Sequence, residues 1–173
     1  MAYFNLNRRF VGRETYDQDE LMAAHLRGKF VGWDKVLENR SNVIVAAANF
    51  GKTAEMVHQA ALLRSKGEVA VFIALRELAS GGALDKALEG DERDAYRAWK
   101  ASPTARITVF VDSLDEAAAG KSESIMRLVE IVADELGWPN EHVRWVIYTA
   151  CDSHGEYLRK TNAPAFEVGH KAY

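Results

Sequence analysis

Four short runs of apolar residues, separated by segments with helical spacing, constrain the fold of this 173-residue chain more than any other feature. Each run is apolar along almost its whole length, which is typical of a strand that is buried on both faces. The runs are Asn42–Ala47, Val69–Leu75, Ile107–Val111 and Val143–Thr149. Because strands that alternate with helices form right-handed crossovers, we predict a three-layer αβα fold of the α/β class, with a mostly parallel sheet of about four to five strands.

The segments between the runs have the periodicity of amphipathic helices. Thr53–Lys66 is expected to be a helix that ends at Gly67, and Ser122–Leu136 is expected to be another. Residues 84–100 are expected to form one helix or a broken pair. In the helix before Gly67, the residues expected to face inward are Met56, Val57, Ala60, Ala61, Leu63 and, as a further candidate, Ala54.

Length and spacing predict a single domain with three segments. Residues 1–41 are expected to be a helical or irregular lead-in, with short helices over Asp19–Gly28 and around Trp33, Val36 and Leu37. Residues 42–150 are expected to be the core, and residues 151–173 a tail without strong periodicity. An apolar run of about 18 residues, long enough to span a membrane, does not occur in the sequence.

Charge and cysteine content limit the function classes. The formal net charge of −3, from 22 basic and 25 acidic residues, gives no direct signal for nucleic acid or for an anionic membrane. The single cysteine, Cys151, excludes an intrachain disulfide and fits a reducing compartment, so a cytoplasmic location is expected. The five histidines show no zinc-ligand spacing.

The first apolar run leads into the segment Ala46–Thr53, which matches the phosphate-loop pattern G-x-x-x-x-G-K-[ST] at every position except Ala46. In such a loop, backbone N–H groups and a helix N-terminus hold phosphate oxygens. The lysine reaches the β and γ phosphates, and the hydroxyl binds Mg²⁺. The residues expected to bind a nucleotide are therefore Ala48, Asn49, Phe50, Gly51, Lys52 and Thr53. The alternative is an ordinary helix N-terminus with an exposed lysine.

Acidic residues follow the third apolar run. Asp112 stands directly at its end, where a carboxylate can complete a Mg²⁺ site with Thr53. Asp115 and Glu116 follow within one turn, where either carboxylate can polarise an attacking water as the catalytic group. The alternative is a solvated acidic loop, or capping of a following helix by Asp112 or Asp115.

The order of these motifs resembles a known family. Gly32-Trp33-Asp34-Lys35-Val36-Leu37 leads into VIVAAANFGKTAEM, then QAALLRSKGEVAVFIALRELA, then VFVDSLDEA. Residues 30 to 150 are similar to the nucleotide-binding domain of STAND-class P-loop NTPases of the NACHT type, especially bacterial ones. The resemblance implies a P-loop NTPase-like sheet, ATP (or GTP) with Mg²⁺, slow hydrolysis, a nucleotide-controlled signalling switch, and a role in defence against phage.

Three departures from this family pattern limit which properties of the family are expected of this chain. Ala46 replaces the first loop glycine, and Cys151 stands where relatives carry an arginine that senses the γ-phosphate. The lid and winged-helix segments of relatives do not fit into residues 151–173. Two functions therefore remain open: a nucleotide-binding domain with weak or impaired hydrolysis, and a degenerate P-loop scaffold that acts as a protein-interaction module without turnover. A protein partner or self-association is compatible with both.

Overall fold

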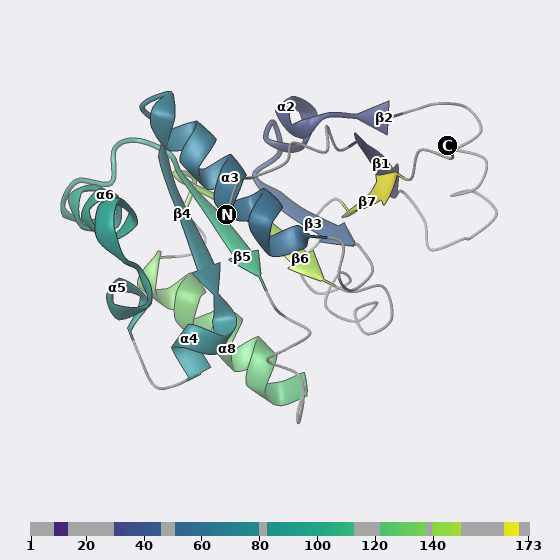
Figure 1. The fold of residues 1–173 in the computed structure, drawn as a ribbon. Helices are drawn as coiled ribbons and strands as arrows, with labels where there is room; N and C mark the ends of the chain where they lie inside the picture. The colour runs from purple at the N-terminus through teal and green to yellow at the C-terminus, as the bar shows by residue number, and fades with distance from the viewer. Residues whose placement is uncertain are drawn as a thin grey trace.

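In a computed structural model, the described residues form a seven-stranded sheet at the centre of the protein. The structure describes residues 9–13, 30–45, 51–79, 83–112, 122–137, 140–149 and 165–169. The strands are β1 (Arg9–Arg13), β2 (Phe30–Val31), β3 (Ser41–Val45), β4 (Val69–Ala74), β5 (Ile107–Asp112), β6 (Val143–Thr149) and β7 (Ala165–Gly169). Their order across the sheet is β2-β1-β7-β3-β6-β5-β4. The strands from β7 to β4 run parallel, and β1 and β2 are antiparallel additions at one side (Figure 1).

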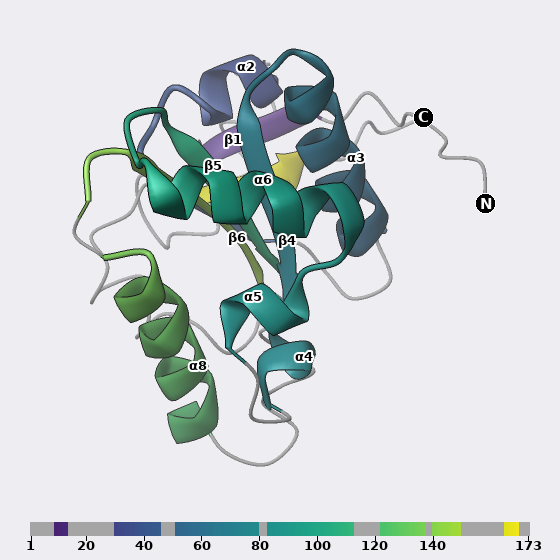
Figure 2. The ribbon, with the colours of Figure 1, turned by 90° about the vertical axis from the view of Figure 1, so that its left-hand side faces the viewer.

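Helices cover both faces of the sheet. They are α2 (Trp33–Val36), α3 (Lys52–Ser65), α4 (Leu75–Ala79), α5 (Leu84–Ala87), α6 (Gly90–Ala101) and α8 (Ser122–Glu135). Buried side chains of α2 and α3 belong to the apolar cluster on one face, and those of α4, α5, α6 and α8 belong to the cluster on the other. The ribbons of α3 and α8 lie on opposite sides of the sheet (Figures 1 and 2). The predicted three-layer α/β fold with a mostly parallel sheet is therefore confirmed.

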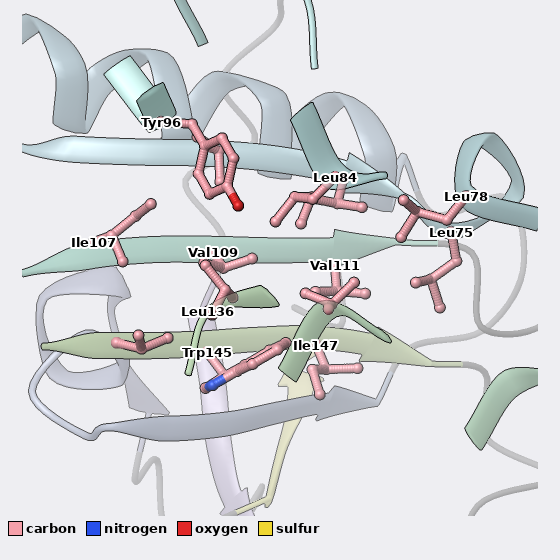
Figure 3. Packing of buried hydrophobic residues seen from close by; sticks show 14 of the residues in the cluster. Leu75, Leu78, Leu84, Tyr96, Ile107, Val109, Val111, Leu136, Trp145 and Ile147 are labelled. Carbon is pink, nitrogen blue, oxygen red and sulfur yellow. The ribbon is translucent and has the colours of Figure 1, made fainter. Parts of the chain in front are cut away.

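Two apolar clusters form the core, one on each face of the sheet. On β5, Ile107, Val109 and Val111 belong to the first cluster and Phe110 belongs to the second, because successive side chains of a strand point to opposite faces. The first cluster is shown in Figure 3, where these β5 side chains face residues of the covering helices such as Leu84. Burial on both faces explains why the strand sequences are apolar throughout.

The predicted strands and helices of the core are present at the expected places. Residues 84–100 form the broken pair, because Leu88 and Glu89 have extended backbone dihedrals between α5 and α6. Gly67 ends α3 as predicted, with φ of 82°. The N–H of Gly67 donates to the carbonyl of Arg64, and the N–H of Glu68 donates to the carbonyl of Leu63. This arrangement is the Schellman motif.

The sheet is larger than the sequence indicated. Strands β1 and β2 lie in the segment expected to be a helical or irregular lead-in, and β7 lies in the segment expected to be a tail. They are short, and β1 pairs with β7 across almost the whole chain, from Arg9 opposite Gly169 to Arg13 opposite Ala165. Such strands carry little local signal, since their stability depends on distant pairing. The predicted helix over residues 19–28 lies outside the described residues, whereas the one at Trp33 is confirmed as α2.

The inward face of α3 differs from the prediction. Val57, which was expected to face inward, is 43% exposed, and Ala54 and Ala61 are also exposed. The expectation was wrong at these positions because it sorted residues by polarity. The buried residues follow the helical repeat instead, and they are Glu55, Met56, Gln59, Ala60 and Leu63.

Candidate functional site

The N-terminus of α3 begins with a glycine in a backbone conformation that favours glycine. Gly51 has φ of 67° and ψ of 29°, which is the left-handed region that residues with a Cβ rarely adopt. The N–H of Glu55 donates to the carbonyl of Gly51 at 3.1 Å, which starts the helical hydrogen bonding. The first N–H groups of a helix lack intrahelical acceptors and carry partial positive charge. This end of α3 therefore has the chemistry of an anion site.

Thr53 and Asp112 meet at the carboxyl edge of the sheet. Asp112 ends β5, and the hydroxyl of Thr53 in the first turn of α3 donates a hydrogen bond to its carboxylate. β3 and β5 are parallel, with β6 between them, so the carboxyl ends of β3 and β5 lie at the same edge. Since a buried charge needs a partner, the Thr53 contact stabilises a carboxylate that is only 2% exposed.

The donor set of this pair fits a divalent cation. A hydroxyl and a carboxylate are hard oxygen ligands, and Mg²⁺ is bound by one or two carboxylates together with hydroxyls, waters and substrate phosphates. Thr53 and Asp112 are the residues that would hold the ion. Among the described residues, no group of three or more His, Cys, Asp and Glu side chains forms a separate metal cluster.

Glu55, in the first turn of α3, makes a second polar contact. Glu55 is 2% exposed, and its Oε1 accepts hydrogen bonds from Trp33 Nε1 at 2.8 Å and from Gln59 Nε2 at 3.4 Å. The Trp33 ring also packs edge-on against Phe10 and Phe110, with centroids 5.0 and 6.0 Å away. The sequence predicted a short helix at Trp33 but indicated no role for Glu55. No local signal would have found the pair, because it joins two different helices.

The structure places only part of the predicted site. Gly51, Lys52 and Thr53 open α3, with Lys52 half-buried, and Asp112 lies beside Thr53. The predicted nucleotide-binding residues Ala48, Asn49 and Phe50 lie outside the described residues. The same holds for the two candidate catalytic residues, Asp115 and Glu116, and for the two departures from the family pattern, Ala46 and Cys151.

The arrangement of sheet and flanking helices defines a three-layer α/β fold with a mostly parallel sheet. No protein-family model matches the sequence, and no curated protein matches it significantly. Among solved structures, PCH-2 of C. elegans is similar, with a TM-score of 0.47 and 14% sequence identity. The match covers 94% of this chain and 45% of PCH-2, so this chain spans less than half the length of that protein. A similarity of this degree indicates neither a ligand nor an activity.

In the described part of the chain, no helix is both long enough and apolar enough to cross a membrane.

Proposed function

We propose that this chain is a Mg²⁺-dependent nucleoside triphosphate-binding domain with ATP (or GTP) as its ligand. The observation that carries the proposal is the contact between Thr53 and Asp112 at the carboxyl edge of the sheet. Ligands of open α/β sheets bind at this edge. Lys52 opens α3 at the same place and supplies a cation for the β and γ phosphates, and the amides from Ala48 to Gly51 would surround the phosphate oxygens.

The proposed reaction is slow hydrolysis of the bound triphosphate. Bound Mg²⁺ would supply neutralisation of the charge that develops on the phosphate oxygens. Asp115 or Glu116 would orient the attacking water, and Thr53 and Asp112 would hold the metal ion. Cys151 stands where an arginine would stabilise that charge, and loss of such a group lowers the rate by about 10³–10⁵. Binding with weak turnover is therefore expected.

The motif order supports a more specific role. Residues 42–150 would be the nucleotide-binding core of a cytoplasmic signalling switch of the STAND type, similar to NACHT proteins. The Asp112–Glu116 acidic motif and the tryptophan helix before β3 support this assignment. A contribution to defence against phage, and self-association or a protein partner in the activated state, are the roles that this resemblance implies.

Substitution of Lys52 tests nucleotide binding. Lys52→Ala is expected to abolish binding of Mg·ATP and Mg·GTP in isothermal titration, because the lysine is the cation that meets the phosphates. The matched control is Lys66→Ala, which removes a lysine from the opposite end of the same helix. In thermal-shift assays, nucleotide at 100 times its Kd is expected to add about 2.7 kcal/mol to the stability of the wild type and of Lys66→Ala.

If Lys52→Ala binds as tightly as the wild type, the nucleotide assignment is wrong. If the wild type itself binds neither ATP, GTP nor ADP, the scaffold alternative is favoured instead.

Substitution of Asp112 tests the metal site. Asp112→Asn keeps an oxygen that can accept the hydrogen bond from Thr53 but removes the negative charge that attracts Mg²⁺. We expect the variant to fold and to bind nucleotide equally well with and without Mg²⁺, whereas wild-type binding is strengthened by the ion. Titrations in Mg²⁺ and in EDTA measure this difference, with Asp91→Asn as an exposed acidic control. A Mg²⁺ effect of wild-type size in Asp112→Asn would exclude Asp112 as a ligand.

A further inference from the structure

We propose that Trp33 is a positioning residue for the phosphate and magnesium site, acting on the first turn of α3 and on the end of β5 at the same time. This inference rests on the proposed function, because it concerns the residues that would hold the nucleotide and its metal ion. It assigns a role to the short helix α2, which comes before the sheet core in the chain and contributes no ligand of its own.

A hydrogen bond between Trp33 and Glu55 joins α2 to the first turn of α3. Glu55 lies two residues after Thr53 in α3, and its own N–H makes the first hydrogen bond of that helix. Its carboxylate is buried and accepts the indole N–H at 2.8 Å. Hydrogen bonds to charged groups are stronger than neutral ones, and a buried carboxylate that loses a donor is strongly destabilised. The indole therefore fixes the position of the first turn.

The indole ring of Trp33 also contacts β5. Phe110 lies two residues before Asp112, and alternate residues of a strand share a face, so both side chains point toward α3 and α2. Trp33 packs edge-on against Phe110 and also against Phe10 of β1. One side chain thus contacts a residue two positions from Thr53 and a residue two positions from Asp112.

The consequence is that the indole sets the spacing of the two metal-site residues. Displacement of the first turn of α3 would move the Thr53 hydroxyl away from the Asp112 carboxylate. Trp33 opposes that movement because it contacts both α3 and β5. Metal and phosphate sites depend on such supporting contacts, since ligand groups must be held in position before the ligand arrives.

Trp99 provides a matched comparison for this role. It is a buried tryptophan whose Nε1 donates to the carbonyl of Ala105, also at 2.8 Å. Its ring stacks on Tyr96 in the cluster on the other face of the sheet. Replacement of Trp99 by Phe removes an indole hydrogen bond of the same length, on the face of the sheet opposite to α2 and α3.

Hydrogen exchange in the nucleotide-free protein tests the positional claim alone. Trp33→Phe is expected to accelerate exchange of the Glu55 and Met56 amides by about tenfold or more, the factor that corresponds to one lost hydrogen bond to a charged group. Trp99→Phe is expected to leave these two amides unchanged. Equal exchange at Glu55 and Met56 in the wild type and in Trp33→Phe would overturn the proposal.

Nucleotide titration tests the consequence for the site. We expect Trp33→Phe to raise the Kd for Mg·ATP about tenfold, in line with the same lost hydrogen bond, and Trp99→Phe to leave it unchanged. Glu55→Gln keeps an acceptor for the indole and is expected to bind within about twofold of the wild type, whereas Glu55→Met removes the acceptor and should behave like Trp33→Phe. Glu55→Met also serves if Trp33→Phe does not fold.

The outcomes separate this inference from the proposed function. If the wild type and Trp33→Phe bind Mg·ATP equally well, the positioning role is wrong and the proposed function stands. If the wild type binds no nucleotide while Trp33→Phe alone accelerates exchange at Glu55 and Met56, the proposed function is wrong and the claim about the first turn of α3 is supported.

Discussion

Arg144 is a buried cation that has no carboxylate hydrogen-bond partner among the residues that the structure describes. It lies near the start of β6 with 8% of its surface exposed, and its Nη1 donates to Thr108 Oγ1 at 3.3 Å. Within the described part of the chain, its Nε is buried without a hydrogen-bond partner. Burial lowers the pKa of the guanidinium, the nearby charge of Arg106 lowers it further, and the charge of Glu68 partly opposes both effects. This side chain therefore destabilises the folded state electrostatically.

Replacement of Arg144 by an apolar residue of similar length is expected to stabilise the protein. Arg144→Met keeps the aliphatic packing and removes a poorly compensated buried charge, so we expect the free energy of unfolding to rise by about 1 kcal/mol. Urea unfolding followed by circular dichroism measures the change. Arg127→Met, at an exposed position of α8, is expected to change stability by less than about 0.5 kcal/mol. A loss of stability in Arg144→Met would show that the cation makes a favourable contact that outweighs its burial.

At the scale of elements, the sequence predicted those whose pattern is local. β4, β5 and β6 are buried on both faces, so their sequences are apolar throughout and their positions could be predicted closely. The same reasoning was insufficient for β1 and β7, because each is specified mainly by pairing with the other from the opposite end of the chain. Local patterning contains no information on such a distant partner.

The residues of the candidate site were also predictable from the sequence only where the pattern is local. Gly51, Lys52, Thr53 and Asp112 belong to short motifs that follow apolar strands, so the sequence was enough to select them. The buried Glu55 was missed, since a charged residue on a helix is normally solvated. Its burial depends on the indole N–H of Trp33, which belongs to a separate helix.

At the scale of the whole molecule, α6 lies across the β4 edge of the sheet, and an ion pair joins it to α3 (Figure 2). Arg64 of α3 and Glu92 of α6 form an ion pair at 2.5 Å, and so join the helical layers on the two faces around this edge. Arg64 Nη1 also donates to the carbonyl of Ala70 at 3.0 Å, and Glu92 accepts the N–H of Phe72 at 3.4 Å. These two backbone groups would otherwise be available to a strand of another molecule.

Removal of Glu92 is expected to promote self-association. Glu92→Ala leaves the N–H of Phe72 without its carboxylate and frees Arg64, so we expect a loss of about 1 kcal/mol in stability and a shift toward higher-mass species at high protein concentration. Size-exclusion chromatography with light scattering measures the mass. The control is Asp91→Ala, an exposed acidic residue next to Glu92. If both variants show the wild-type mass distribution, the ion pair does not protect the edge.

The position of β7 affects how the sheet forms during translation. β7 follows all other strands in the chain, yet it lies between β3 and β1 and joins them. During translation, β1 and β2 therefore emerge from the ribosome first. The strand that links them to the rest of the sheet emerges last of the seven. Phe10, which is fully buried in the finished protein, remains without that support until then. Apolar surface that is exposed in this way favours aggregation until the last strand has paired.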